Sequence, residues 1–330
     1  MDSHSTEMDS NVSDTKPLFS VVVPVYGNSA TLGPLLRRLE ELAGGLPGPL
    51  EAVFVVDGSP DDSYDVLRSI LPGARIQTQL LSHSRNFGSF PAIRSGMGAA
   101  RGDHIGVMAA DLQEPPELMV EFFRALHGGV ADVAVGRRES RNDPHLSALL
   151  ARSYWSFYRR HVIRDIPPGG VDVFAVTRQV ADQILSLNEL HSSLVGLLYW
   201  VGYRRVEIPY SRLERTEGKS GWTFKKKVRY LSDSVFSFTD LPISVLTSIG
   251  AVGAVVTLVV GMAVLVGRFT GNIEVPGYSA LMLVLLFSTF VILYGLGVVG
   301  SYVWRIYENT KGRPTAIVAE ARRFGAVREG

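Results

Sequence analysis

The segment VMAADLQEPPE, Val107 to Glu117, joins the end of an apolar run to a polar cluster and then to a helix signal. The run in which it begins, HIGVMAAD (104–111), has the composition and length of a buried strand. A Pro-Pro pair then leads into LMVEFFRAL, whose apolar residues recur at helical spacing. The segment therefore predicts a strand that ends in Asp111, Gln113 and Glu114 just before a helix.

Three earlier apolar runs repeat this strand–helix pattern. The segments between them, such as TLGPLLRRLEEL and PDDSYDVLRSIL, place apolar residues at helical spacing. Alternating strands and helices predict an α/β fold with a mostly parallel, Rossmann-like sheet, whose ligand crevice lies at the carboxyl ends of the strands. The strand ends at Tyr26, Asp57 and Asp111 are therefore expected on one rim. The earlier runs are SVVVPVY (20–26), EAVFVVD (51–57) and QLLS (79–82).

The composition excludes several classes of function. The chain has 330 residues and a formal net charge of +1, so it lacks a global signature of polyanion binding, and no nucleic-acid partner is expected. It contains no cysteine, which excludes disulfides, thiolate metal sites and cysteine nucleophiles. The mean hydropathy of +0.16 is high for a soluble protein and indicates membrane segments.

Two uncharged apolar runs account for this hydropathy. Residues 241–267 and 278–304 contain no Asp, Glu, Lys, Arg or His, and each exceeds the roughly 20 residues that cross a bilayer. They predict two transmembrane helices of an integral membrane protein; two buried helices of a large soluble core are the alternative. Basic residues flank the outer ends of the pair, so both termini are expected in the cytoplasm.

These patterns divide the chain into segments with different expected environments. The polar N-terminal segment predicts a disordered tail without a signal peptide. Apolar residues beside lysines, ahead of the first span, predict an amphipathic helix in the membrane interface. The expected boundaries are 1–17 for the tail, 18–221 for the globular domain, 222–240 for the amphipathic helix, 241–267 and 278–304 for the spans, 268–277 for the extracytoplasmic loop and 305–330 for a cytoplasmic tail.

The polar cluster after 104–111 suits a divalent cation. If the extended conformation continues, residues two apart point to the same side, and the oxygens of Asp111 and Gln113 converge. Hard oxygen ligands of this kind suit Mg²⁺ or Mn²⁺, which also bind substrate phosphates. Glu114 is a candidate further ligand. The alternative is that Asp111 only begins a loop and Glu114 caps the following helix.

Basic groups and glycines complete the candidate site. The glycines of SRNFGSFPAIRSGMGAARGD (84–103) do not fit G-x-G-x-x-G and fall late in a helical pattern, which argues against a dehydrogenase. Small residues such as Gly96 are expected to let that helix pack closely, and Arg85 can approach the crevice. GRRESR, with Arg137, and RLERTEGKSGWTFKKK carry cations that suit phosphates. For the lysines, contact with anionic lipid headgroups is the alternative.

Several short pieces also occur in the order of a known family: SVVVPVYGNSATL, VVDGSPDDS, LSHSRNFGSFPAI, MAADLQEPPEL, VGRRESR, GGVDVF and IPYSRLERTEGKSGWTFKKK. From Phe19 to about Arg305 the chain resembles the membrane-bound polyprenyl-phosphate glycosyltransferases of glycosyltransferase family two, relatives of dolichol-phosphate mannose synthase and the bactoprenol glucosyltransferases. The resemblance implies a GT-A catalytic domain, Mg²⁺ or Mn²⁺, and transfer of one sugar from a UDP- or GDP-sugar to a polyprenyl phosphate such as undecaprenyl phosphate.

The resemblance also implies roles for particular residues. Three motifs depart from those of many relatives, because Val56 and Ala109 replace acids and Gly27-Asn28 stands where relatives have Asn-Glu. The departures concern metal affinity and the identity of the nucleotide base. The implied roles are nucleotide binding at Pro24, Tyr26, Asp57, Gly58 and Arg85, metal binding at Asp111 and Gln113, and catalytic contacts at Asp111, Arg137, Arg215, Lys219 and Ser220.

The chemistry of the acceptor is consistent with these roles. A polyprenyl phosphate oxygen is anionic near neutral pH, so its attack on the anomeric carbon needs no strong general base. No second nucleophile is evident, so inversion is expected. The alternatives are a processive polysaccharide synthase, against which two spans and the absence of Q-x-x-R-W argue, and a non-catalytic membrane partner, which Ala109 favours. Membrane lipids and a second copy of the chain are further expected partners.

Overall fold

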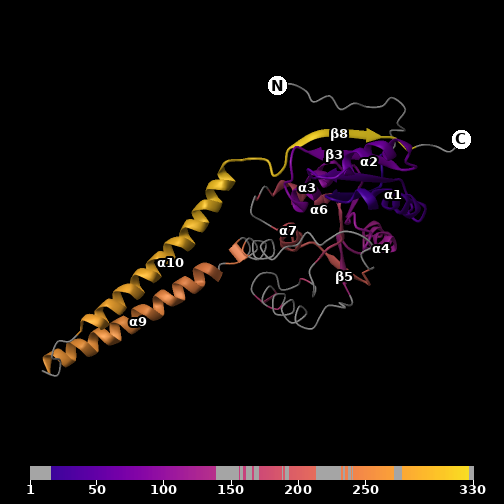
Figure 1. The fold of residues 1–330 in the computed structure, drawn as a ribbon. Helices are drawn as coiled ribbons and strands as arrows, with labels where there is room; N and C mark the ends of the chain where they lie inside the picture. Colours follow the sequence, from indigo (N-terminus) through magenta and orange to yellow (C-terminus); the bar gives the residue numbers. More distant parts are fainter. Residues whose placement is uncertain are drawn as a thin grey trace. The chain divides into compact units, whose positions relative to one another are not determined.

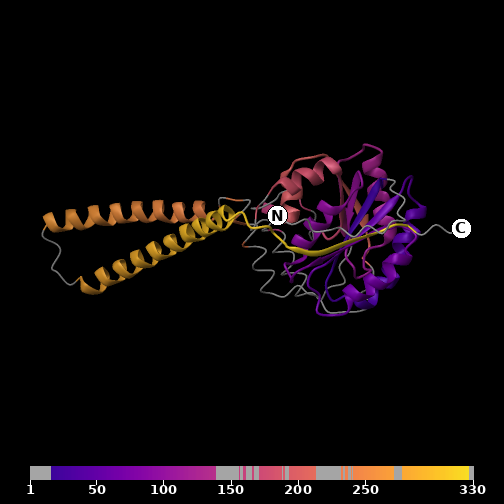
Figure 2. The ribbon, with the colours of Figure 1, turned by 90° about the horizontal axis from the view of Figure 1, so that it is seen from above.

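The computed structural model describes residues 16–138, 171–187, 193–212, 241–270 and 277–326, with single positions between these ranges. The chain divides into two compact units, which are Met1–Lys227 with Pro314–Gly330, and Val228–Arg313. The first unit contains the sheet and its covering helices, and the second contains two long apolar helices (Figures 1 and 2).

The first unit is built on an eight-stranded sheet with the order β7-β5-β6-β4-β1-β2-β3-β8. Its centre, β4-β1-β2-β3, is parallel, whereas β6 and β8 run antiparallel to their neighbours and β5 pairs with β7 in parallel. The predicted mostly parallel α/β sheet is confirmed. The strands are β1 Phe19–Val25, β2 Leu50–Val56, β3 Gln77–His83, β4 His104–Val107, β5 Val133–Arg138, β6 Phe174–Thr177, β7 Arg205–Tyr210 and β8 Val318–Phe324.

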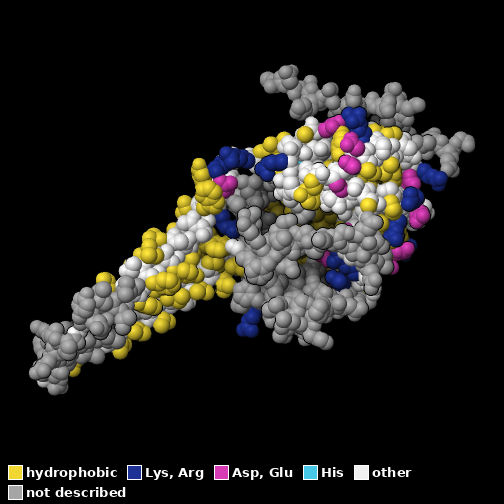
Figure 3. Space-filling view, in the orientation of Figure 1, with side chains coloured by type: hydrophobic (Ala, Val, Ile, Leu, Met, Phe, Trp, Pro, Cys, Tyr) yellow, Lys and Arg dark blue, Asp and Glu magenta, His cyan; other side chains and the backbone are white. Residues whose placement is uncertain are grey.

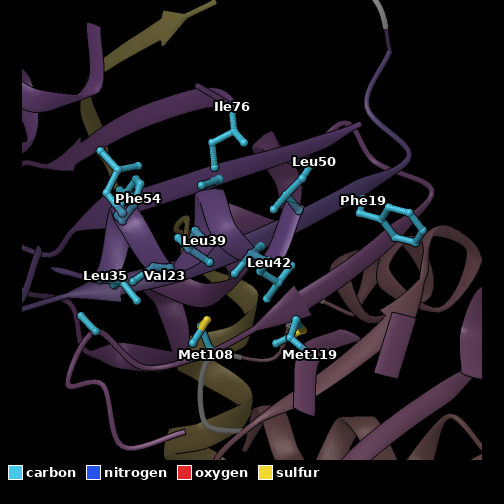
Figure 4. Packing of buried hydrophobic residues seen from close by; sticks show 14 of the residues in the cluster. Phe19, Val23, Leu35, Leu39, Leu42, Leu50, Phe54, Ile76, Met108 and Met119 are labelled. Atoms are coloured by element: carbon cyan, nitrogen blue, oxygen red, sulfur yellow. The ribbon is translucent and has the colours of Figure 1, made fainter. Parts of the chain in front are cut away.

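Helices cover both faces of this sheet, so its central strands are apolar on both sides. α1 and α4 pack on the face to which Phe19 and Val23 point (Figure 4), and α3 and α6 lie on the opposite face. The helices that the sequence predicts between the strands are confirmed. The described helices are α1 Ser29–Gly44, α2 Ser63–Ile70, the 3-10 helix Leu71–Gly73, α3 Ser89–Ala99, α4 Pro116–His127, α6 Arg178–Ser186 and α7 Leu194–Trp200.

The expected close packing of α3 is visible at Gly96. A Cβ atom at this position would lie 2.3 Å from a methyl carbon of Val22 and 3.1 Å from one of Val55. Since Cβ atoms are not found at such distances, only glycine allows α3 to approach β1 and β2 this closely. Gly96 therefore serves packing, whereas Gly98 has no atom within 4 Å of the place that a Cβ would occupy.

β4 is shorter than predicted, because it ends at Val107 and not at Asp111. Beyond it the backbone carbonyl of Ala110 accepts a hydrogen bond from the Thr31 hydroxyl, and Asp111 Oδ1 accepts one from the Gln113 N–H. Such local side-chain bonds compete with a strand ladder. Leu112 has φ 60°, in the left-handed region that non-glycine residues rarely adopt. Residues 111–113 are therefore turned, which corrects the prediction of an extended segment.

β8 lies in residues 305–330, for which the sequence predicts only a cytoplasmic tail. It pairs antiparallel with β3 and forms one edge of the sheet (Figure 1). Arg323 of β8 donates a hydrogen bond to buried Gln79, and the Ser84 N–H donates to the Ile317 carbonyl. The last strand of the sheet therefore comes from sequence that follows the apolar helices.

The second unit contains α9 Leu241–Phe269 and α10 Tyr278–Thr310. Their apolar side chains are largely exposed, and Figure 3 shows hydrophobic side chains along these helices. Among the residues that the structure describes, Phe287–Thr310 is long and apolar enough to cross a membrane, and Leu241–Gly253 is a shorter apolar stretch. The second predicted span is thus not established by this criterion. Most of the predicted amphipathic helix, 222–240, lies outside the described residues.

Candidate active site

Polar residues lie along one side of the sheet, at the carboxyl ends of its parallel strands. β1, β2, β3, β4, β5 and β7 have their carboxyl ends there, while antiparallel β6 and β8 begin there. We call this line of strand ends the rim. Around it lie Tyr26, Asp57, Arg85, Asp111, Arg138, Asp172 and Arg212.

A hydrogen-bond network centred on Asp61 joins the rim loops after β1 and β2. Asp61 Oδ1 accepts hydrogen bonds from the hydroxyls of Ser59, at 2.5 Å, and Ser63, at 2.6 Å. Asp61 Oδ2 accepts one from the Ser29 N–H at the start of α1, at 3.0 Å. The Gly27 N–H in turn donates to Ser59 Oγ at 2.8 Å. This Asp61 network fixes the loop that presents Tyr26.

Asp61 is held as a carboxylate by these donors. Partial burial raises its pKa, but hydrogen bonds from Ser59, Ser63 and Ser29 outweigh burial and hold the pKa of this carboxyl far below its usual range. Asp61 was not identified from the sequence. The signal was present in the segment DGSPDDS, where an acid stands between two serines that follow a strand end.

Asp57, predicted to contact the nucleoside, is 3% exposed and faces the protein itself. Its Oδ1 lies 2.8 Å from His83 Nδ1, and its two oxygens accept hydrogen bonds from the backbone N–H groups of Phe87 and Gly88. His83 Nε2 lies 2.9 Å from Ser95 Oγ on α3. In this structure Asp57 holds the loop after β3 in place, and direct contact with a nucleoside stays a prediction.

Gly58 is required by the same loop. It has φ +56°, and a Cβ atom on it would lie 2.4 Å from the backbone of Arg85 and Asn86. The Arg85 guanidinium stacks on the Phe87 ring at 4.0 Å and is exposed. The structure thus brings the predicted residues Asp57, Gly58 and Arg85 together at the ends of β2 and β3.

Tyr26 and Pro24 lie next to this loop, at the end of β1. Tyr26 is 52% exposed directly beyond the strand, and Pro24 is partly buried opposite Val55 of β2. An exposed aromatic ring on a fixed loop at the carboxyl ends of parallel strands is suited to stack on a nucleoside. We call Tyr26, Pro24 and Arg85 the donor side of the rim, because the sequence predicts that they contact the nucleotide of a sugar donor.

Asp111, Asp172 and Arg212 meet where β4 and β7 end and β6 begins. The Arg212 guanidinium lies 3.7 Å from Asp111 Oδ2 and 3.5 Å from Asp172 Oδ2. The side chain of Asp111 is 13% exposed and that of Asp172 is 45% exposed. Asp172 was not identified from the sequence, where it appears only inside GGVDVF. The position of Asp172 is determined by β6, and this strand has only four residues, too few to be predicted from the sequence.

Glu114 is the most buried carboxyl group of this cluster. It is 1% exposed, and neither of its carboxylate oxygens has a hydrogen-bond partner among the described residues. Burial and the negative charge of Asp111 raise the pKa of Glu114 to about 7, and Arg212 opposes this shift. Burial, with the charges of Asp172 and Glu114, also raises the pKa of nearby Tyr210.

The two arginines at the end of β5 face opposite sides of the sheet. Arg137, the predicted phosphate contact, is exposed and lies 3.7 Å from Glu207 of β7. Arg138 stands opposite Tyr210 in the strand register and interacts electrostatically with it, so Arg138 is the arginine on the side of the acidic cluster. The basic segment GRRESR, which contains both Arg137 and Arg138, was predicted to supply cations that suit phosphates. Alternation along β5 separates the two residues.

The residues at Asp111 can be tested for fit to a divalent cation. No group of three or more His, Cys, Asp or Glu side chains in the described part of the chain is arranged to hold a metal ion. Asp111 and unpartnered Glu114 still offer hard anionic oxygens, as Mg²⁺ and Mn²⁺ require when phosphates and water complete the shell. Gln113 is 9% exposed beside Asp111. The predicted Arg215, Lys219 and Ser220 lie outside the described residues.

A mostly parallel α/β sheet with polar residues at the carboxyl ends of its strands is the arrangement that the sequence predicts for a GT-A domain. Residues 20–185 match the model of glycosyl transferase family 2, and the chain belongs to this family. An "uncharacterized glycosyltransferase" of Synechocystis sp. is 32% identical over 301 residues, which cover 91% of this chain and 94% of that protein. The SfII prophage-derived bactoprenol glucosyl transferase of Shigella flexneri is 29% identical over 305 residues, covering 92% and 98%.

Solved structures give a more distant similarity. A mannosyltransferase from Pyrobaculum calidifontis, solved with GDP-Man and Mn²⁺, aligns over 89% of this chain and 88% of its own, with 13% identity and a TM-score of 0.43. The family membership itself follows from the sequence matches. The family resemblance drawn from DLQEPPEL and its neighbouring motifs is confirmed.

Proposed function

We propose that the protein transfers one sugar from a UDP- or GDP-sugar to a polyprenyl monophosphate at the cytoplasmic face of a membrane. The name of the Shigella relative supports the lipid acceptor. The observation that carries the proposal is the rim, where a fixed donor-side loop adjoins Asp111 and two arginines, Arg138 and Arg212.

The donor nucleotide is proposed to bind at the ends of β1, β2 and β3. Tyr26 and Arg85 are exposed there for contact with the base and ribose, beside Pro24. Asp57 and Gly58 position this surface, because they hold the loop after β3. A rigid surface of this kind reduces the entropy that is lost when the nucleotide binds.

The departing diphosphate is proposed to lie against Asp111 and the arginines. Mg²⁺ or Mn²⁺ held by Asp111 and Gln113 would supply positive charge to the diphosphate oxygens. Arginine forks match phosphate oxygens and stabilise the charge that develops on them. We assign this role to Arg138 and Arg212 from the structure. From the family motif we also propose it for Arg137, Arg215, Lys219 and Ser220.

The acceptor phosphate needs no side chain to remove a proton before it attacks. The anomeric carbon–oxygen bond to the diphosphate breaks as the bond to the lipid phosphate forms, and the configuration inverts. The lipid chain stays in the bilayer, since each buried CH₂ contributes about 0.8 kcal/mol. We propose that both α9 and α10 cross the membrane and keep the enzyme where its acceptor is, because 241–267 and 278–304 are free of charge.

The proposal is tested by incubating the purified protein with undecaprenyl phosphate, Mg²⁺ or Mn²⁺, and one nucleotide sugar at a time. Mass spectrometry of the lipid is expected to show one added sugar with one of the donors. Asp111→Asn is expected to reduce the rate at least 100-fold, about 2.7 kcal/mol of transition-state stabilisation, while the protein stays folded. Several sugars per lipid, or no product with any donor, would contradict the proposal.

A further inference from the structure

Arg212 lies between carboxylates without forming good hydrogen bonds to them. Its guanidinium nitrogens are 3.7 Å from Asp111 and 3.5 Å from Asp172, longer than a well-formed N–H···O contact. Its Nε has no hydrogen-bond partner among the described residues. Its side chain is 22% exposed, so water screens it only in part. Arg212 therefore acts at Asp111 chiefly through its charge.

Negative charge is concentrated around this guanidinium. Glu114 is buried beside Asp111, with both carboxylate oxygens unpartnered among the described residues. Asp111 and Asp172 act on Glu114 as like charges, and Arg212 acts as the opposite charge. A cluster of this composition attracts a cation strongly. Among the described residues, Arg212 is the cation whose contacts to both Asp111 and Asp172 the structure gives.

A divalent cation bound at Asp111 changes this balance, and here the inference rests on the proposed function. Two cations in contact with the same carboxylate repel each other. A planar guanidinium, in contrast, matches the oxygens of a diphosphate. We propose that Arg212 and the divalent cation compete for Asp111, and that cation binding releases Arg212 to hold the donor diphosphate.

The competition predicts effects of opposite sign when Arg212 is replaced. Without its charge, Mn²⁺ meets a more negative site and binds more tightly in the absence of nucleotide. The nucleotide diphosphate loses a phosphate contact and binds more weakly in the presence of Mn²⁺. A residue that only supports the fold of the site would weaken both. The test therefore needs binding measurements and not turnover.

The experiment compares wild-type protein with Arg212→Gln, Asp111→Asn and Arg204→Gln. Arg204 pairs with Asp132 at the opposite edge of the sheet, so its replacement removes the same charge away from the rim. Mn²⁺ affinity is measured from the electron paramagnetic resonance signal of free Mn²⁺. UDP and GDP binding are measured by calorimetry at saturating Mn²⁺.

In Arg212→Gln we expect Mn²⁺ to bind about fivefold more tightly and the nucleotide about tenfold more weakly, with Arg204→Gln unchanged. Unchanged or weaker Mn²⁺ binding in Arg212→Gln, with Mn²⁺ binding lost in Asp111→Asn, would overturn the competition and leave the proposed metal site standing. Unaltered Mn²⁺ binding in Asp111→Asn would overturn both.

Discussion

Two glycines of the rim have left-handed backbones for different reasons. Gly27 has φ +70° and no atom within 4 Å of the place that a Cβ would occupy, whereas Gly58 has φ +56° and backbone atoms of Arg85 and Asn86 at 2.4 Å from that place. Replacement of Gly27 by alanine therefore costs only the free energy of holding a non-glycine residue in the left-handed conformation. Replacement of Gly58 also displaces the loop that Asp57 holds.

Gly27→Ala and Gly58→Ala therefore form a matched pair. Gly27→Ala is expected to lower the free energy of unfolding by about 1 kcal/mol, and Gly58→Ala by about 3 kcal/mol. Gly58→Ala should also weaken UDP or GDP binding, because Arg85 moves. Thermal unfolding in detergent and calorimetry with the nucleotide check both effects. Equal losses in the two variants would contradict the packing argument.

Asp61 predicts a particular dependence of stability on pH. Its folded pKa is depressed, so its stabilisation is present above the unfolded pKa of about 3.9 and is lost as pH falls towards the folded pKa. Asp61→Asn is expected to cost roughly 2 kcal/mol at pH 7. The difference from wild type should stay constant between about pH 5 and 8 and shrink below about pH 4.

The adjacent Asp62 supplies the control for this measurement. It precedes α2 without a side-chain capping hydrogen bond. Asp62→Asn is therefore expected to leave the unfolding temperature nearly unchanged over the same pH range. An effect of Asp62→Asn as large as that of Asp61→Asn would show that the loss of any negative charge here, and not the loss of the Asp61 hydrogen bonds, determines the stability at low pH.

At the scale of elements, the central strands could be predicted because parallel strands buried on both faces are long and apolar. β1 and β2 satisfy this condition, whereas β3, QTQLLSH, is buried but largely polar, and only its part QLLS was predicted. The prediction for β4 was too long, since side-chain hydrogen bonds of Thr31 and Asp111 end this strand. β6 has four residues and β8 is the charged segment VAEARRF, so neither carries a strand pattern. Their pairing with β4 and β3 determines their conformation.

The candidate site could be predicted where a motif lies directly at a strand end. The positions of Asp57 and Tyr26 at the rim were predicted in this way, and their roles stay predictions. Asp172 and Arg212 come together only through the order of β4, β6 and β5-β7 in the sheet, which no local pattern contains. His83 was missed because its partner Asp57 belongs to a neighbouring strand.

β8 is expected to stabilise the edge strand β3 and the loop after it. Deletion of residues 315–330 removes the β3–β8 pairing and the Ile317 carbonyl that receives the Ser84 N–H. The open strand edge should promote aggregation, and nucleotide affinity should fall. Size-exclusion chromatography and calorimetry measure these effects. Deletion of 327–330 alone is the control, and identical behaviour of both truncations would contradict this role.

At the scale of the whole molecule, the absence of cysteine allows a direct test of the proposed membrane crossing. Single-cysteine variants Asn272→Cys, between the two apolar runs, and Arg313→Cys, after the second, are labelled with a membrane-impermeant maleimide. We expect Asn272→Cys to react in intact cells and Arg313→Cys only after permeabilisation. Reaction of both under the same condition would contradict a hairpin of two spans.

The edge strand β8 also has a consequence for biosynthesis. β3 is made early, but its partner follows α10 in the chain. The ribosome must therefore complete the apolar hairpin before the catalytic sheet can close. A polypeptide released before that point keeps an unpaired edge on β3, so the sheet of the finished enzyme closes only after both long apolar helices have been made.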